Sequence, residues 1–302
     1  MCGITGVIHP KGKDVIEKMT RVIYHRGPDD DGYFTDEHLA LGMRRLSIID
    51  LARGKQPITS NDGRFVIFFN GEIYNYKEIK KELNDYEFKT DSDTEVILAG
   101  FVKWGENFFS RLRGMFAFAI YDTEKQKLTL ARDFFGIKPL YYWIDNGRVL
   151  AFSSEIKSFL SLPDFKPEVN DRAVFNYLSF QYNPLEETFF KGVFTLPPAH
   201  SMAIDAKTGH VGIKRYWQFE FKQNDSLDEK KTAKKILAVM QDSVAHHMIA
   251  DVPVGSFLSG GIDSSIIATL MSRSLTSQDR GSPISSAKSG QKVKTFTVGF
   301  ES

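Results

Sequence analysis

Short runs of apolar residues, separated by turn residues, follow one another through the first two thirds of the chain. Four of these runs, at 65–69, 115–121, 127–131 and 149–153, are rich in aromatic and β-branched residues and are bounded by Gly, Asn or Asp. Such runs are typical of β-strands. The pattern therefore predicts a domain that contains at least one β-sheet.

A helical pattern interrupts these strands after residue 91. Ser92 and Glu95 stand three residues apart, as in a capping box, and place Asp93 in the first turn of a helix. The apolar residues that follow recur every three or four positions, at Val96, Ile97, Phe101, Trp104 and Phe108. This spacing puts them on one helix face. Helices that cover sheets in this way predict an α+β domain.

The pattern loosens over 197–227, and we place a domain boundary near residue 215, giving domains at 2–215 and 216–302. The elements predicted beyond it are a helix at 236–248, a strand at 254–258, a helix at 266–275 and a strand at 294–300. A strand, a helix and a second strand predict a partial α/β domain with a parallel sheet. The polar segment 276–294 predicts a mobile surface loop.

Composition narrows the class of protein. The length of 302 residues suits two domains, and 42% hydrophobic with 25% charged residues is typical of a soluble globular protein. A net charge of +1, with no basic block among aromatics, argues against a nucleic-acid partner. No apolar run approaches the roughly 20 residues of a membrane span, so we expect no membrane partner and a cytoplasmic location.

The single cysteine, Cys2, follows the initiator Met directly, so removal of Met1 would put a thiol and an α-amine on one residue. The amine can accept the thiol proton, and the thiolate can attack an amide carbonyl, form a thioester and release ammonia. Asn70 and Gly71 are candidate donors to the oxyanion that this attack creates. The alternatives are an incidental cysteine, a hairpin turn at Asn70 and Gly71, and ordinary charges at Arg45 and Asp93.

Several motifs together resemble the class II glutamine amidotransferases. In chain order they are MCGITG, HRGPDDDG (25–32), RRLSIID (44–50), FNGEIYNY (69–76), DSDTEVIL (91–98), LRGMFAFAIYD (112–122) and RDFFGIKPLYY (132–142). The later motif SFLSGGIDSS (256–265) resembles the pyrophosphate loop of the glutamine-hydrolysing asparagine synthetase family. The resemblance covers nearly all of residues 1–270.

The resemblance implies a role for each matching residue of the first domain. It implies the four-layer α-β-β-α fold of N-terminal nucleophile hydrolases, with Cys2 as nucleophile and Arg26 in support. The remaining implied residues are the oxyanion donors Asn70 and Gly71, the α-amine partners Glu72 and Asp93, and the pocket strand Arg45, Leu46, Ser47, Ile48 and Ile49. Arg45 would bind the glutamine α-carboxylate with its forked guanidinium.

The second domain is similar to the adenine nucleotide α-hydrolases, which implies an ATP site. The loop SGGIDSS lacks a Lys before Ser264, so it is not the common Lys-containing phosphate loop, and a plain strand-to-helix turn is the alternative. The implied ATP-binding residues are Leu258, Ser259, Gly260, Gly261, Asp263, Ser264 and Val298. Asp263 is also the implied Mg²⁺ ligand. His246 and His247 point about 100° apart on a helix and make a poor metal pair.

The resemblance implies an asparagine synthase that converts ATP, aspartate and glutamine to asparagine, glutamate, AMP and pyrophosphate. It implies Mg²⁺ with ATP, no organic cofactor, and a homodimer. The family continues beyond the last residue here, so we expect a fragment in which only the glutaminase half is complete. Two alternatives stay open: amidation of a cell-wall, sugar or antibiotic precursor, and a non-catalytic subunit for ammonia channelling.

Overall fold

The computed structural model describes residues 1–9, 12–223, 228–276 and 292–299, and the chain divides into two compact units, Met1–Phe219 and Glu220–Ser302. The strands of the first unit are β1 (Gly3–Val7), β2 (Asp30–Thr35), β3 (Ala40–Arg45), β4 (Ile58–Thr59), β5 (Phe65–Ile73), β6 (Gly114–Asp122), β7 (Lys127–Arg132), β8 (Tyr141–Asp145), β9 (Arg148–Ser153), β10 (Val193–Thr195), β11 (His200–Asp205) and β12 (Val211–Arg215). Its helices are α1 (Lys13–Val22), α2 (Tyr76–Glu82), α3 (Asp93–Trp104) and α4 (Asp171–Phe180), with short 3-10 helices at Tyr24–Arg26, Gly105–Arg111 and Ile156–Ser161. All four predicted strands are confirmed, in β5, β6, β7 and β9.

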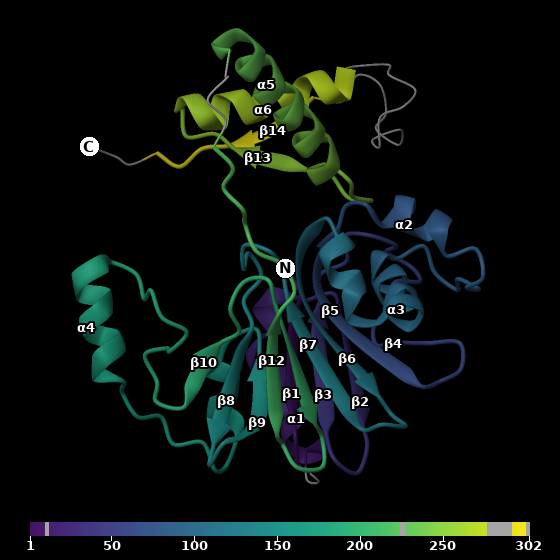
Figure 1. Cartoon of the computed structure of the whole chain (residues 1–302), viewed down its shortest axis with the longest axis vertical. Coiled ribbons are helices and arrows are strands. Elements are labelled where there is room, and N and C mark those ends of the chain that lie inside the picture. Colours follow the sequence, from purple (N-terminus) through teal and green to yellow (C-terminus); the bar gives the residue numbers. More distant parts are fainter. Residues whose placement is uncertain (10–11, 224–227, 277–291, 300–302) are drawn as a thin grey trace. The chain divides into compact units, whose positions relative to one another are not determined.

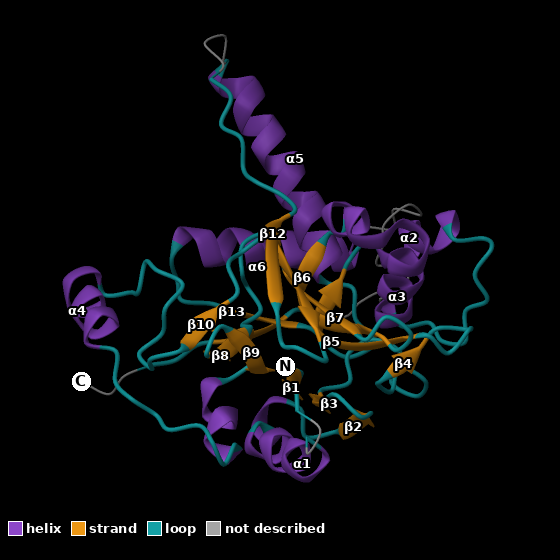
Figure 2. Ribbon diagram, turned by 60° about the horizontal axis from the view of Figure 1, so that its bottom comes forward, coloured by secondary structure: helices purple, strands orange, loops and turns teal. Residues whose placement is uncertain are grey.

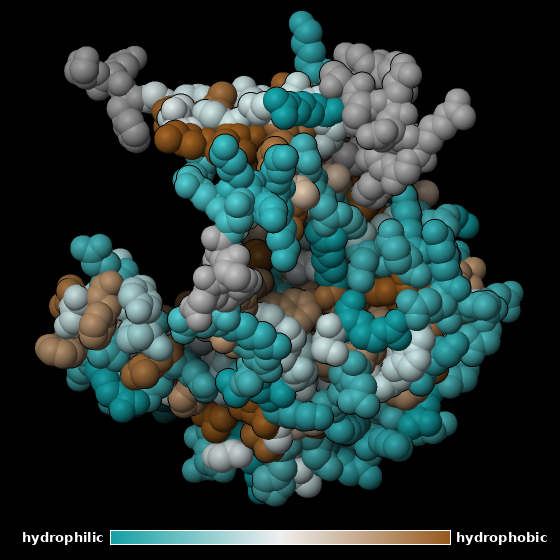
Figure 3. Space-filling model, turned by 45° about the horizontal axis from the view of Figure 1, so that its top comes forward, coloured by the Kyte–Doolittle hydropathy of each residue, from teal (hydrophilic) through white to brown (hydrophobic). Residues whose placement is uncertain are grey.

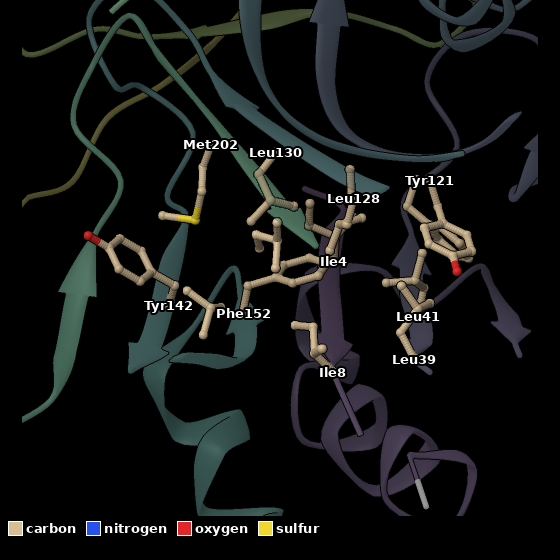
Figure 4. Packing of buried hydrophobic residues seen from close by; sticks show 14 of the residues in the cluster. Ile4, Ile8, Leu39, Leu41, Tyr121, Leu128, Leu130, Tyr142, Phe152 and Met202 are labelled. Carbon is tan, nitrogen blue, oxygen red and sulfur yellow. The ribbon is translucent and has the colours of Figure 1, made fainter. Parts of the chain in front are cut away.

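These strands form two six-stranded sheets, in the orders β10-β8-β9-β1-β3-β2 and β12-β11-β7-β6-β5-β4. The sheets are stacked face to face, and Figure 4 shows the apolar side chains that fill the space between them. Alternation along β1 explains this packing, because successive side chains of a strand point to opposite faces. Ile4 joins the core between the sheets, whereas Val7 packs with Ile16 and Met19 of α1 on the outer face.

Helices cover the outer face of each sheet (Figures 1 and 2). On the first sheet, α1 and the 3-10 helix at Ile156–Ser161 bury a second apolar cluster that includes Phe159. On the second sheet, α3 packs against β5, and the rings of Phe101 and Phe65 meet edge to face with their centroids 5.7 Å apart. The unit therefore has the four-layer α-β-β-α architecture, and the expected α+β fold is confirmed.

Helix α3 begins where the sequence predicts, but it ends earlier. The Ser92 hydroxyl accepts the Thr94 N–H, so Ser92 is the N-cap. Glu95 does not complete the capping box; its carboxylate accepts the N–H groups of Lys89 and Thr90 instead. Gly105, with φ of 61°, ends the helix. The predicted helical position of Phe108 is therefore wrong, because Phe108 lies in the 3-10 helix that follows.

Helix α4 differs from the other helices of the first unit because much of its apolar surface is exposed. Phe175 is 69% and Leu178 is 75% exposed, and only Ala173 of this helix is buried. Figure 3 shows tan and brown atoms gathered on this lobe. The two apolar clusters of the first unit contain no residue of α4, so their packing does not depend on this helix.

The second unit contains α5 (Glu229–His247), β13 (Gly255–Phe257), α6 (Ile262–Thr276) and β14 (Lys294–Phe296). Strands β13 and β14 pair in parallel, which confirms the predicted partial α/β domain. Apolar residues of α5 and α6 form a small core, centred on Val244, Met248, Leu270 and Met271. Residues 277–291 of the predicted mobile loop lie outside the described residues.

Candidate active site

Cys2 lies just before β1, and its main chain is fixed from two sides. Gly3 pairs with Arg44 of β3, and the Arg26 Nε–H donates a 2.8 Å hydrogen bond to the Cys2 carbonyl. The Cys2 Sγ accepts the Leu46 N–H at 3.4 Å. These contacts fix the sulfur at one position beside the end of β3. A fixed position is what the predicted nucleophile would require.

Asn70 and Gly71 lie inside β5, opposite Ala117 and Phe116 of β6. The alternative of a hairpin turn at this pair is therefore wrong. A Cβ atom at residue 71 would come within 2.1 Å of the Met115 carbonyl oxygen. Only glycine allows the two strands to approach this closely, so Gly71 is required by packing as well as being a candidate donor.

The Asn70 side chain points inward, toward the first sheet, and is fully buried. Its Nδ2 lies 3.5 Å from the Ser154 Oγ, which accepts the Ile4 N–H at 3.0 Å. Among the described residues, Asn70 Oδ1 has no hydrogen-bond partner. If the amide turns over, Oδ1 can accept the Ser154 O–H, and Nδ2 becomes free to donate to an oxyanion.

Arg45 ends β3 and is only 4% exposed, so its interpretation as an ordinary surface charge is wrong. Its Nη2 donates to the carbonyl oxygens of Ile49 and Asp50, at 3.1 and 2.9 Å. These two bonds fold the chain after β3 back around the guanidinium. A buried guanidinium whose other N–H groups face a pocket suits an anionic ligand such as a carboxylate.

Asp93, at the start of α3, is 4% exposed, and its Oδ2 accepts the Ile73 N–H at 2.9 Å. This bond ties α3 to the end of β5. Burial raises the pKa of Asp93 to about 7, and the nearby carboxylate of Glu72 acts in the same direction. An arriving ammonium group would favour the ionised form, so Asp93 is suited to bind an amine near neutral pH.

One pocket of the first unit brings most of the predicted glutamine-site residues together. The lining residues are Met1, Cys2, Arg45, Leu46, Ile48, Ile49, Gly54, Gln56, Phe69, Gly71, Glu72, Ser92, Asp93, Thr94 and Lys138. Two predicted residues, Ser47 and Asn70, are absent from this lining. The Ser47 N–H donates to Asp29 at 2.8 Å, and Asn70 lies behind the wall in the core.

The sequence did not assign four polar residues to this pocket, Gln56, Ser92, Thr94 and Lys138. Gln56 clamps β5, since its Oε1 accepts the Phe69 N–H at 2.7 Å and its Nε2 donates to the Phe69 carbonyl at 3.2 Å. Lys138 is 2% exposed and lies in the motif RDFFGIKPLYY. A lysine between apolar residues of that motif was a usable signal, because a buried lysine is rare without a specific reason.

The electrostatic balance at Cys2 combines burial with surrounding cations. Burial raises the pKa of the Cys2 thiol above its ordinary value. The hydrogen bond from Leu46 and the charges of Arg45 and Lys138 act in the opposite direction. Among the described residues, no group of three His, Cys, Asp or Glu side chains could hold a metal ion.

The predicted phosphate loop lies between β13 and α6 in the second unit. Ser259 Oγ and Ser264 Oγ are 3.0 Å apart, and the Ser264 hydroxyl donates to the Gly261 carbonyl. Gly260 has φ of 84°, a conformation that glycine adopts without strain. The loop therefore turns sharply onto the N-terminus of α6, where backbone N–H groups favour an anion.

The other predicted ATP-site residues lie near this loop. Leu258 follows β13 and Val298 follows β14, so both lie at the same edge of the parallel pair, and the Leu258 N–H donates to the Phe296 carbonyl. Asp263 is in the first turn of α6. His246 and His247 contact different backbone oxygens, those of Asp242 and Ser243, each at 2.8 Å.

Comparison with known families decides the relationship. The sequence model of the glutamine amidotransferase domain matches residues 1–217, and that of asparagine synthase matches residues 235–302. The chain belongs to the glutamine amidotransferase domain family. The predicted resemblance to glutamine-hydrolysing asparagine synthetases is confirmed as well. Among the described residues of this amidotransferase-family chain, every helix is too short or too polar to cross a membrane.

Curated relatives of this amidotransferase-family chain include asparagine synthetase [glutamine-hydrolyzing] 1 of Bacillus subtilis, which is 44% identical over 100% of this chain and 46% of its own length. A putative asparagine synthetase of Methanocaldococcus jannaschii is 36% identical over 100% of this chain and 60% of its own. Amidase chry2 of Gibberella zeae is 35% identical over 100% of this chain and 47% of its own length. The chain spans about half the length of the curated relatives it matches.

Solved structures support the fold. Glutamine phosphoribosylpyrophosphate amidotransferase from Bacillus subtilis matches 91% of this chain and 64% of its own, with a TM-score of 0.53 and 16% identity. An allosteric regulatory enzyme of purine biosynthesis matches 88% of this chain and 62% of its own, with a TM-score of 0.55 and 16% identity. At this identity the likeness concerns the fold alone, and it agrees with the four-layer α-β-β-α architecture of the first unit.

Proposed function

We propose that this chain is the glutamine-hydrolysing part of a glutamine-dependent amidotransferase, an asparagine synthase (glutamine-hydrolysing). The observation that carries the proposal is the single pocket that gathers Cys2 with Arg45, Gly71, Glu72 and Asp93. Glutamine needs a nucleophile at its amide, a cation at its α-carboxylate and an anion at its α-amine. The pocket supplies all three, each on a buried or half-buried side chain.

The proposed reaction begins once Met1 has been removed. The α-amine of Cys2 takes the thiol proton, and the thiolate attacks the side-chain amide carbon of glutamine. Asn70 and the Gly71 N–H stabilise the oxyanion. As the tetrahedral intermediate collapses, the amine returns its proton to the leaving nitrogen, so ammonia departs and a thioester remains. Water then hydrolyses the thioester, giving glutamate and the free thiol.

In this proposal the remaining pocket residues orient glutamine. Arg45 binds the α-carboxylate, and Asp93 with Glu72 binds the α-amine. Leu46, Ser47, Ile48 and Ile49 contribute the chain that surrounds the substrate. Arg26 supports Cys2 through its carbonyl rather than contacting the reacting atoms. Asp93 is ionised by the substrate ammonium, whose charge offsets the cost of burying the carboxylate.

For the second unit we propose a share in an ATP site that serves amidation of aspartate. Support comes from the asparagine synthase match at 235–302 and from the loop at the N-terminus of α6. The proposed nucleotide-binding residues are Leu258, Ser259, Gly260, Gly261, Asp263, Ser264 and Val298. Asp263 would hold Mg²⁺ together with ATP phosphates, since one carboxylate is a typical protein contribution to such a site.

The proposal also covers the domain bounds, the location, the oligomeric state and the partners of the enzyme. It comprises domains at 2–215 and 216–302, a cytoplasmic homodimer, and glutamine, ATP and aspartate as the small-molecule partners. It includes no organic cofactor and no nucleic-acid or membrane partner. The name of the relative Amidase chry2 favours a second candidate, in which the same glutaminase serves a different carboxylate acceptor. A non-catalytic channelling role is disfavoured by the presence of Cys2, Arg45 and Asp93 in one pocket.

Glutamate formation from glutamine, followed by a coupled dehydrogenase assay, tests this function. The chain should release glutamate, and Cys2→Ala should lower the rate by at least about a thousandfold, because the proposed reaction proceeds through the Cys2 thiolate. Mass spectrometry should show that active chains begin at Cys2. Cys2→Ala that turns over glutamine at the wild-type rate, or full activity with Met1 attached, would contradict the mechanism.

A further inference from the structure

Lys138 is a buried cation that the reaction described above does not use. Lys138 is 2% exposed, and it lines the same pocket as Cys2 and Glu72. Among the described residues, no hydrogen bond or ion pair reaches its Nζ. Burying the lysine side chain costs its ammonium part of its hydration, and no direct partner in the described part of the chain offsets that cost, so a ligand or a functional charge would explain its position in the pocket wall.

The backbone around Lys138 is held firmly, so its side chain enters the pocket from a fixed base. The Lys138 N–H donates to Asp133 Oδ2 at 2.9 Å, and the Lys138 carbonyl accepts from Arg132 Nε at 2.8 Å. Asp133 Oδ2 also accepts the Phe116 N–H at 3.2 Å. Because Phe116 is the strand partner of Gly71, the loop that carries Lys138 is joined directly to the proposed oxyanion strand.

The charges that face Cys2 come from several elements. Arg45 ends β3, and the Arg26 side chain donates to the Cys2 carbonyl. Glu72 is the last residue but one of β5, and Lys138 lies in the loop after β7. Arg45 and Arg26 are already committed to backbone carbonyl oxygens. Burial lowers the pKa of Lys138, whereas Glu72 and the Cys2 thiolate favour its charged form. Lys138 is therefore the cation of this group whose charge is not committed to another contact.

We propose that Lys138 is an electrostatic residue of the glutaminase site, whose ammonium stabilises the Cys2 thiolate and keeps the neighbouring α-amine in its neutral, proton-accepting form. The proposal rests on Cys2 being the nucleophile. A positive charge beside both groups favours loss of a proton from each, which prepares the nucleophile and its base together. In this proposal Lys138 acts on the protonation of Cys2 and does not contact glutamine. It is therefore a positioning residue that acts through its charge.

The single cysteine of the chain gives a direct test. The rate of iodoacetamide alkylation, followed by intact mass from pH 5 to 9, reports the thiolate fraction of Cys2 without requiring turnover. Lys138→Met keeps the length of the side chain and removes the charge. We expect alkylation at pH 7 to slow about tenfold, with the profile displaced to higher pH, and the acidic limb of kcat/KM for glutamine to move in the same direction.

Three further variants keep the test decisive. Lys138→Arg retains the charge and should alkylate with the wild-type pH profile. Lys191→Met removes an exposed lysine that pairs with Glu168, and it should change neither alkylation nor turnover. If Lys138→Met does not fold, Lys138→Gln keeps a polar end and answers the same question.

The outcomes separate this proposal from its foundation. An alkylation profile of Lys138→Met identical to wild type would overturn the role of Lys138 even if glutamine hydrolysis stands. A rise in KM alone, with unchanged alkylation, would also overturn it, since that result means Lys138 only neutralises Glu72 or binds substrate. Glutamine turnover by Cys2→Ala would instead remove the proposed function itself.

Discussion

The two units place their candidate sites in opposite physical environments. In the first, the charged residues Arg45 and Asp93 are each 4% exposed between filled layers of helix and sheet. In the second, the loop follows a two-stranded sheet, and Phe257 is 80% and Ile262 79% exposed. The first site is held by burial and by hydrogen bonds from neighbouring strands. The second is held by local backbone conformation, so substitutions should affect the two very differently.

The largest expected difference concerns aromatic side chains. Phe68 is fully buried between the sheets, and Phe68→Ala should lower the free energy of unfolding of the first unit by about 4 kcal/mol. Phe257→Ala, on the exposed face of β13, should change it by less than about 0.5 kcal/mol. The tryptophans Trp104, Trp143 and Trp217 all lie in the first unit, so their fluorescence in urea reports that unit. If Phe68→Ala and Phe257→Ala lowered the free energy of unfolding equally, the expected difference between the two units would be wrong.

Gly71→Ala should have the next largest effect. Its Cβ would meet the Met115 carbonyl oxygen at 2.1 Å, and backbone cannot move aside as a flexible side chain does. We expect a loss of about 3 kcal/mol in stability and at least a hundredfold in kcat/KM for glutamine, because the oxyanion donor shifts with the strand. Gly212→Ala on β12, where a Cβ meets nothing within 4 Å, is the matched control and should be neutral.

The environment of Asp93 makes the stability of the first unit depend on pH. Burial raises its pKa from 3.8 to about 7, so between these values the native state holds a proton that the unfolded state has lost. The contribution of Asp93 to stability is therefore fully present below pH 4 and declines as the pH rises toward 7. Asp93→Asn cannot ionise and should not show this decline. Relative to wild type, it should gain about 4 kcal/mol between pH 4 and 8.

Urea unfolding of both proteins at each pH measures that difference. The matched control is Asp263→Asn in the second unit, which should leave the fluorescence transition of the first unit unchanged at every pH. A constant difference between wild type and Asp93→Asn across the pH range would show that Asp93 is not the titrating group. Asp93→Asn should nevertheless weaken glutamine binding, since a neutral amide attracts the α-ammonium less than a carboxylate does.

The sequence predicted the elements well where local pattern decides. Strands β5, β6, β7 and β9 and the Ser92 N-cap follow from composition and periodicity alone. The end of α3 was misplaced because the apolar period continues to Phe108, while Gly105 at positive φ breaks the helix. Periodicity records which residues are buried and does not record where the backbone changes direction.

The site was harder to predict because its decisive contacts are long-range. Motifs indicated Arg45 and Asp93, but nothing in the chain near them shows that both are buried. Asn70 was predicted as an oxyanion donor from its motif, but its side-chain neighbour Ser154, 84 positions away, is set by the folded sheets. Lys138 was missed because its importance arises from Asp133 and Phe116, which fix its loop beside Gly71 only in the folded sheet.

Gly260→Ala gives the smallest expected effect and tests whether the second site is truly governed by local backbone. A Cβ at this position meets no heavy atom within 4 Å, so the only cost is the strain of φ at 84°, about 1 kcal/mol. That cost should fall on the loop. Amide hydrogen exchange over 258–265 should quicken about fivefold, while glutamine hydrolysis and the tryptophan transition stay at wild-type values. A loss of glutamine hydrolysis in Gly260→Ala would contradict this expectation. It would mean that a change in the loop of the second unit alters the activity of the first unit.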